Sequence, residues 1–230
     1  MDKEKRIVPG YEGLLRSHMI QVPPCISECT GIRIFGRRIK SFVFSTDVAI
    51  IKNINADAVI AVYPFTPQPT ISRAVLTAAD MPVFSGIGGG TTNGPRVLRL
   101  GCDAEDQGAS GVVVNAPISN EIIRGLKEQL DIPIVATVVS DQTDIQARID
   151  AGTSILNVSG AADTARIVSV IRKKFPHLPI IATGGPTEES IIRTIEAGAN
   201  AITYTPPTTA ELFGGLMAKY RQVMTENDSY

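Results

Sequence analysis

The sequence predicts a single-domain (β/α)8 TIM barrel, and three observations carry that prediction. The chain has 230 residues, which suits a barrel of about 200 to 250 residues. Short apolar runs rich in β-branched residues recur along it, with room for one helix between neighbouring runs. The last five runs begin 22, 22, 24 and 22 residues apart, the spacing of one strand, one helix and two short loops.

The apolar runs mark eight expected strands. They are nearly continuous in apolar residues rather than alternating, as parallel strands covered on both faces should be. In chain order they begin at Phe42, Ala58, Pro82, Gly111, Pro133, Ile155, Pro179 and Ala201. A doubly wound open sheet would use the same kind of strand, but it seldom has eight evenly spaced units.

Helix start and stop signals fall between these runs. Gly108, Gly152 and Gly198 stand where helices should end, because glycine accepts the left-handed conformation beyond a helix C-terminus. Residues 143–146 and 208–211 have the pattern of capping boxes that open the fifth and eighth helices. We therefore expect a helix after every strand.

Residues 1–40 precede the repeat, and residues 41–230 form the expected barrel. Within the first segment, residues 32–39 predict a small hairpin that turns at Gly36. Because this segment leads directly into the first strand, it should lie at the N-terminal end of the barrel and close the bottom.

Composition and charge exclude several classes of function. With 22 basic and 23 acidic residues the net charge is −1, which argues against nucleic acid or an anionic membrane as partner. No apolar run approaches the roughly 20 residues that cross a bilayer, and the N-terminus lacks the apolar core of a secretory signal. We therefore expect a cytoplasmic protein with reduced cysteines, a small-molecule ligand and, as an open alternative, a homo-oligomeric state.

Candidate catalytic residues lie at the carboxyl ends of the strands, where barrel enzymes carry their chemistry. The histidines, His18 and His177, fall outside this face, which argues against a Ser-His-Asp triad or a histidine-bound metal. No expected strand contains lysine, which argues against Schiff-base chemistry. Acid–base work should therefore fall to one of four carboxylates, Asp47, Asp141, Asp144 or Asp163. Asp47 and Asp141 are the preferred bases, although either could simply favour a helix start.

Amides and glycines at the same face are candidate ligand contacts. Asn115 and Asn157 follow or end their strands and could orient a hydroxyl or carbonyl group. The loop at residues 85–94 includes Gly88, Gly89 and Gly90, whose backbone N–H groups could cradle an anion. The alternative is a flexible lid whose glycines only supply turns.

A thiol nucleophile is a further alternative. Cys29 stands beside Glu28, but no histidine lies near it in the sequence to activate the thiol. A buried structural cysteine is the preferred interpretation of both Cys25 and Cys29.

Residues 182–187 and 196–204 resemble the seventh and eighth units of the phosphate-binding (β/α)8 barrels. That group includes thiamine phosphate synthase, N-acylmannosamine-6-phosphate epimerase and the ketodeoxyphosphogluconate aldolases. The resemblance implies that Gly184 and Gly185, with Thr183 and Thr205, hold a phosphate. Thr205 is followed by two prolines where the family has a Gly-Ser-like turn, and proline offers no N–H.

Two further resemblances bear on cofactors and reaction class. Flavin-dependent barrels such as nitronate monooxygenases share the Gly-Gly and Ala-Gly-Ala rhythm, but their Gly-Gly-His segment is missing, so FMN is not expected. Over nearly its whole length the chain also resembles a bacterial barrel family described simply as hydrolases. No cofactor is expected, and a divalent metal stays open.

Together these features predict an enzyme that acts on a small sugar- or acid-like metabolite, phosphorylated in the preferred case. Carboxylate acid–base chemistry of an isomerase or lyase is favoured. The alternatives are a hydrolase of a small metabolite and a metabolite-binding barrel without catalysis.

Overall fold

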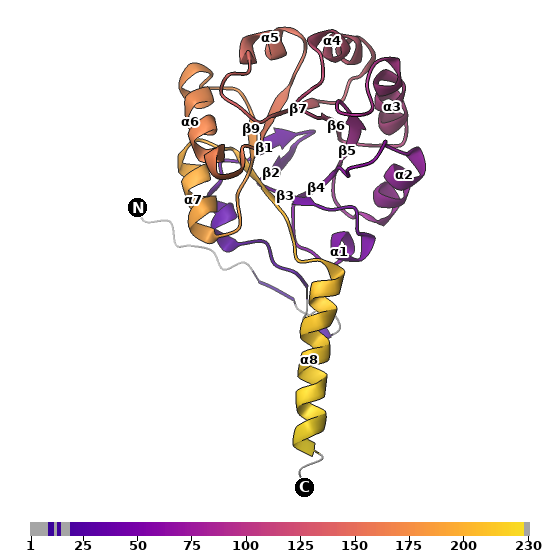
Figure 1. Cartoon of the computed structure of the whole chain (residues 1–230), viewed down its shortest axis with the longest axis vertical. Helices are drawn as coiled ribbons and strands as arrows, with labels where there is room; N and C mark the ends of the chain where they lie inside the picture. The colour runs from indigo at the N-terminus through magenta and orange to yellow at the C-terminus, as the bar shows by residue number, and fades with distance from the viewer. Residues whose placement is uncertain (1–8, 12, 15–18, 228–230) are drawn as a thin grey trace.

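The computed structural model confirms the predicted (β/α)8 barrel (Figure 1). It describes residues 9–11, 13–14 and 19–227; His18 lies outside them. Eight parallel strands close in the order β10-β3-β4-β5-β6-β7-β8-β9, so the last strand pairs with the first. The barrel strands are β3 (Ser41–Phe44), β4 (Ala58–Ala61), β5 (Val83–Gly88), β6 (Gly111–Val114), β7 (Ile134–Val138), β8 (Ile155–Val158), β9 (Ile180–Thr183) and β10 (Ala201–Tyr204).

A helix follows each strand, as expected. The helices are α1 (Val48–Lys52), α2 (Pro69–Ala78), α3 (Pro95–Asp106), α4 (Asn120–Gln129), α5 (Ile145–Asp150), α6 (Thr164–Lys174), α7 (Glu188–Glu196) and α8 (Thr209–Asn227). The predicted box at Thr208 is present, because its hydroxyl and Glu211 cap one another. The expectation for the fifth helix is corrected: Asp144, rather than Thr143, caps α5 by accepting from the Ala147 N–H.

Each of the eight barrel strands contributes at least one apolar side chain to the interior of the barrel. These residues form a single buried cluster, which only a common interior can bring together: Phe42, Ala58, Ile60, Phe84, Val113, Val135, Ile155, Ile181 and Ala201. The rings of Phe42 and Phe84 meet edge to face at 5.2 Å between centroids. The barrel is therefore a packed core with no pore at this level.

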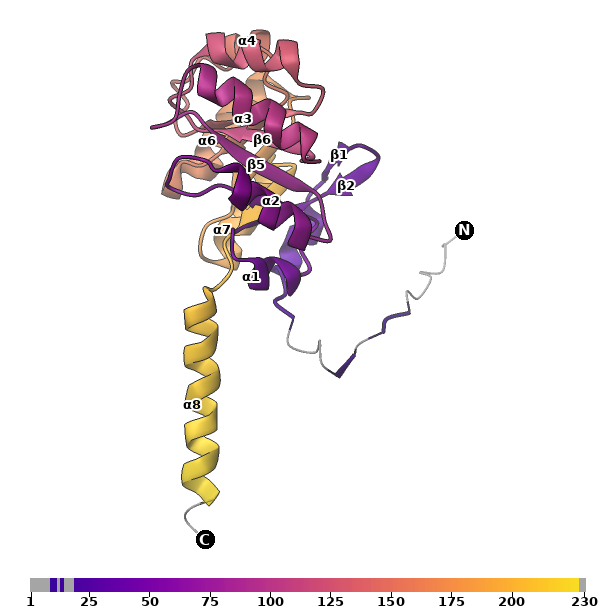
Figure 2. The same ribbon diagram turned by 90° about the vertical axis from the view of Figure 1, so that its right-hand side faces the viewer.

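The predicted hairpin closes the bottom. Strands β1 (Ile32–Ile34) and β2 (Arg37–Ile39) pair antiparallel around a turn at Gly36, whose φ of +81° suits glycine. Ile32, Ile34 and Ile39 join the interior cluster. In Figure 1 the hairpin lies across the middle of the ring of strands, and Figure 2 shows it at one end.

Residues 20–29 cover the outer wall between the last and first units of the barrel. Val22 packs against the clusters on both sides of β10, and the 3-10 helix η2 (Pro24–Glu28) packs on α7. Among the described residues before the barrel, residues 32–39 close the bottom and residues 20–29 cover the outer wall, so this segment has two separate packing roles. A boundary at residue 40 stays a prediction.

Helix α8 differs from the other seven. It does not lie against the barrel wall but projects from it, as both views show (Figures 1 and 2). No helix in the described part of the chain combines the length and apolarity that a bilayer span requires.

Candidate functional site

The mouth of the barrel carries a polar ring above the apolar core. Side chains alternate along a strand, so the residue two positions after a core residue points into the same interior. On five neighbouring strands this residue is an amide or a hydroxyl: Asn115, Thr137, Asn157, Thr183 and Thr203.

Two atoms of this ring are buried without a hydrogen-bond partner. The Asn157 amide donates to Thr137 Oγ1 at 3.3 Å, but its Oδ1 atom has no partner. The hydroxyl of Thr203, a residue only 7% exposed, has none either. An unsatisfied buried polar group costs about 1 to 3 kcal/mol, so these two atoms mark a place where a ligand would restore the missing bonds.

A cavity of about 160 Å³ lies at the same end of the barrel, beside β4, β5 and β6. Residues from the loops after these strands form most of its wall: Val62, Tyr63, Pro64, Phe65, Pro67, Gly86, Gly88, Gly90, Thr91, Thr92, Val113 and Asn115. Asn115 Nδ2 lies 3.9 Å from the position a Gly90 Cβ would take. The space suits a small polar metabolite.

The Gly-rich loop is an ordered wall of this cavity. Gly88 and Gly89 have φ values of +125° and +99°, and the Asn115 N–H donates to the Gly88 carbonyl at 2.9 Å. A Cβ on Gly89 would stand 2.7 Å from the Asn115 backbone nitrogen, so only glycine allows this approach. The next N–H groups, of residues 90–93, donate to no acceptor within the described chain, which leaves them for an anion.

The distribution of acidic residues at the helix N-termini also favours an anion at this cavity. Among the described α-helices, only α2 and α3 have no acidic residue at the N-cap or in the first turn. The loops that lead into these two helices line the cavity through Pro67 and Thr92, and Arg96 lies in the first turn of α3. The positive ends of two helices therefore stay uncompensated by carboxylates here.

The second predicted anion site, at Gly184 and Gly185, has a different environment. Gly185 has a φ of +85°, and a Cβ on Gly184 would meet Ile191 at 2.7 Å, so both glycines are required by packing. The first turn of α7 carries Glu188 and Glu189, and Thr187 already accepts from the Ser190 N–H. Phosphate binding between this loop and the exposed Thr205 stays a prediction, opposed by the two carboxylates.

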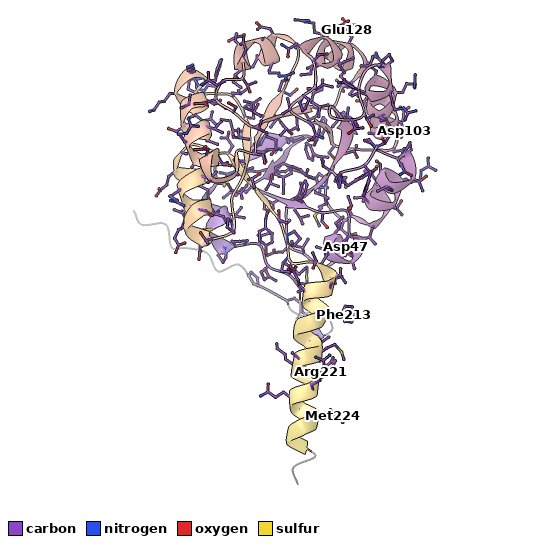
Figure 3. All side chains as sticks on the ribbon, viewed as in Figure 1. Asp47, Asp103, Glu128, Phe213, Arg221 and Met224 are labelled. Atoms are coloured by element: carbon purple, nitrogen blue, oxygen red, sulfur yellow. The ribbon has the colours of Figure 1, made fainter. Side chains whose placement is uncertain are left out.

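Asp47 lies at the N-terminus of α1, close to the start of α8 (Figure 3). One of its oxygens accepts from the N–H groups of Ala49 and Ile50, and the other accepts from the Thr209 hydroxyl. The Thr209 bond, supported by the two amides, holds the pKa of this carboxyl below its usual value. Since a general base works best with a pKa near the working pH, this environment favours the structural role.

Asp141 lies outside the mouth, in a shallow groove between α5 and α6. It forms an ion pair with Arg166 at 2.6 Å, and this bond lowers the pKa of the Asp141 carboxyl. The structure therefore brings Asn115 together with Gly88 and Gly90 at one cavity, but it does not bring Asp141 there.

Tyr63 is a site residue that the sequence analysis did not single out. It is the only ionisable side chain among the cavity's lining residues. Its hydroxyl oxygen accepts from the Gln68 N–H at 2.7 Å, so its own O–H is free to donate to a ligand. Its position in the loop just after β4, at the carboxyl-terminal face, was the signal in the sequence that could have identified it.

Cys25 and Cys29 are buried, as the preferred interpretation requires. Burial raises the pKa of the Cys29 thiol to about 11, and burial with Glu188 nearby raises that of Cys25. At pH 8 both should stay protonated and resist iodoacetamide in the folded protein, since only the thiolate reacts. Mass spectrometry should find Cys102 alkylated first; rapid native alkylation of Cys29 would contradict this burial.

The fold and this mouth define a (β/α)8 barrel with a small polar cavity at its carboxyl-terminal face. No protein-family model matches the sequence, and no curated protein matches it significantly. Solved structures do match. A proposed phosphonomutase from Burkholderia cenocepacia J2315 aligns over 83% of this chain and 94% of its own, with 15% identity and a TM-score of 0.63.

Two more neighbours extend the range of chemistry. Phosphonopyruvate hydrolase in complex with oxalate and Mg²⁺ aligns over 83% of both chains, with 14% identity and a TM-score of 0.61. A 4-hydroxy-tetrahydrodipicolinate synthase from Methylacidiphilum fumariolicum SolV aligns over 72% of this chain and 67% of its own, with 13% identity and a TM-score of 0.56. At these identities the likeness supports the barrel class and carries no argument for the particular phosphate-binding enzymes that the sequence resembles.

One of these neighbours, phosphonopyruvate hydrolase, holds Mg²⁺, so the side chains at the mouth of this barrel can be compared with the ligands that Mg²⁺ prefers. Magnesium is usually bound through carboxylates, but none lines the cavity here. Within the described residues no three His, Cys, Asp or Glu side chains gather closely enough to hold a metal. The donor set at this mouth therefore does not fit a resident Mg²⁺ ion.

Proposed function

We propose that this protein is an enzyme of the isomerase or lyase type that acts on a small anionic metabolite. The observation that carries the proposal is the cavity at the mouth, bounded by unbonded loop N–H groups and by two helix N-termini without carboxylates. The anionic group of the ligand, a phosphate or a carboxylate, binds at residues 88–92. A phosphorylated sugar or acid remains the preferred ligand.

The reacting part of the ligand faces the polar ring. The free side-chain amide of Asn115 and the unpaired atoms of Asn157 and Thr203 hold its hydroxyl or carbonyl oxygens. The Tyr63 hydroxyl donates a hydrogen bond to a carbonyl oxygen of the ligand and stabilises the negative charge that develops on this oxygen when a base removes the proton from the neighbouring carbon. Asp47 and Asp141 stay in this proposal as the predicted bases, although neither of them lines the cavity.

The second candidate is a binding barrel without catalysis. The absence of any carboxylate from the described lining of the cavity favours it, because acid–base enzymes generally place such a group there. A hydrolase is the third alternative, for a ligand whose bond water attacks at the same mouth.

Titration calorimetry with inorganic phosphate and with oxalate tests the anion site. Gly90→Asp should weaken binding by about tenfold or more, roughly 1.4 kcal/mol or more, because it adds a negative charge to the cavity wall. The position has room, since the nearest atom to a Cβ is 3.9 Å away. Gly90→Ala is the matched control for size, and Thr205→Asp the control for charge on the same face; both should bind as the wild type does.

The calorimetric results distinguish the two predicted anion sites. Loss of binding in Thr205→Asp alone would move the anion to the Gly184–Gly185 loop, and no binding by the wild type would refute an anion site. Deuterium incorporation into small 2-oxo acids and sugar phosphates, followed by NMR, tests catalysis. Exchange that Tyr63→Phe abolishes supports the enzyme, whereas binding without exchange of any probe supports the binding barrel.

A further inference from the structure

Helix α8 exposes a continuous apolar stripe on a part of the molecule that touches little of the barrel (Figure 3). Seven large side chains, each between 42% and 61% exposed, form this α8 stripe: Leu212, Phe213, Leu216, Met217, Tyr220, Val223 and Met224. At 3.6 residues per turn they fall within an arc of about 140°. Such a patch is comparable to the largest that a typical monomer exposes, about 300 to 600 Å².

The helix cannot use its own barrel to cover the stripe. In a (β/α)8 barrel the eighth helix normally packs over the last and first strands. Here residues 20–29 occupy that wall: Val22 packs with Tyr204 of β10, and Ile20 pairs with Ile54 beside α1. The position that α8 would take within one chain is therefore filled.

An isolated α8 would also be a weak helix. Helices of this length draw most of their stability from tertiary packing. Gly214 and Gly215 lie in its interior, and each costs about 1 kcal/mol relative to alanine. A partner that buries the stripe would supply the missing stabilisation.

We infer that this partner is a second copy of the chain, whose α8 packs antiparallel against the first around a two-fold axis. The stripe is symmetrical about position 218: Leu216 and Tyr220 lie two residues away on either side, and Phe213 and Val223 five. An antiparallel two-fold pair therefore places Leu216 level with Tyr220 and Phe213 level with Val223 of the second copy. This self-complementarity is what a two-fold interface requires.

A groove at the root of α8 completes the surface. It has a volume of about 230 Å³ and is lined on the barrel side by Ile20, Ala49, Ile50 and Asn53, and on the helix side by Thr209, Leu212, Phe213 and Leu216. In the antiparallel pair the far end of the second α8, with Val223 and Met224, lies over this apolar groove. The inferred dimer thus buries both the stripe and the groove, and it does not depend on the proposed enzymatic function.

Analytical ultracentrifugation of the whole chain tests this inference. The wild type should sediment at twice the 24.5 kDa of one chain. Leu216→Glu combined with Tyr220→Glu should sediment as a monomer, because two charges would be buried in the pair. Ala218→Glu is the matched control: this exposed residue lies on the opposite face of α8, so the dimer should persist. Circular dichroism should show an intact barrel in all three.

Disulfide trapping then tests the antiparallel geometry, in a Cys102→Ser background. Phe213→Cys and Val223→Cys chains should cross-link when mixed and oxidised, and neither should cross-link alone. Self-cross-linking of Phe213→Cys would show a parallel pair and refute the arrangement. A monomeric wild type at tens of micromolar, whether or not it binds phosphatidylcholine vesicles, would overturn the inference altogether.

Discussion

Removal of residues 1–30 is expected to leave a protein that aggregates or fails to fold, although every barrel strand and the hairpin remain. The deletion strips Val22 and η2 from the wall over β10, where Ile26 is 1% exposed and packs in the same cluster as Ile202. Loss of a buried isoleucine side chain alone costs about 2 to 5 kcal/mol. A domain has only about 5 to 15 kcal/mol of stability in total, so the deletion should exceed what the barrel can lose.

Two point variants in the full chain control for the loss of length. Ile26→Ala should lower the thermal midpoint by about 5 to 15 °C, whereas Ser27→Ala, at an exposed neighbouring position, should leave it unchanged. Differential scanning calorimetry measures both. A truncated protein that stays soluble with an unaltered midpoint would show that this wall needs no cover.

Arg172→Met is expected to destabilise the barrel by about 2 to 5 kcal/mol, because several partly buried carbonyl oxygens lose their hydrogen-bond donor at about 1 to 3 kcal/mol each. The Arg172 guanidinium on α6 donates to the carbonyl oxygens of Gly198, Phe175, Pro176 and Leu178 and to Asn200 Oδ1. Asn200 Oδ1 in turn accepts from the Ile180 N–H, at the start of β9. Methionine fills similar volume but removes the donor from the carbonyl oxygens of Gly198, Pro176 and Leu178.

Arg166→Met, on the same helix, is the matched control. Arg166 is exposed and pairs only with Asp141 and Asp163 at the surface, where ion pairs contribute little to stability. Urea unfolding should therefore show a large drop in the transition midpoint for Arg172→Met and almost none for Arg166→Met. Equal drops for the two variants would refute the structural role of the Arg172 network.

Sequence periodicity was sufficient for the barrel because its signal is local. Each unit contains a buried apolar run such as residues 111–114, and these runs recur at nearly constant spacing. Glycine follows the third, fifth and seventh helices, at Gly108, Gly152 and Gly198. The hairpin at residues 32–39 was predictable for the same reason, since two short segments that contain isoleucine flank Gly36.

The site was only partly predictable. Gly88, Gly90 and Asn115 were recognised by residue type and position, and they do meet at one cavity. Tyr63 was not singled out, because nothing in its local sequence shows that the loops after β4 and β5 close on the same space. The sequence also did not show that the cavity beside the loop at residues 85–94 has no carboxylate in its lining, because that depends on which residues lie nearby in three dimensions.

The amino-acid sequence by itself determined the eight strand–helix units, the closing hairpin and a carboxyl-terminal face of the barrel rich in amides, hydroxyls and glycine, because these follow from local pattern and strand direction. Only the tertiary structure shows that Asp47 bonds to Thr209 and Asp141 to Arg166, since these bonds join residues far apart in the chain. The tertiary structure also decided that α8 projects from the barrel and does not pack against its wall. Residues 20–29 compete with that helix for one wall of the barrel, and which segment packs there depends on the summed burial of both.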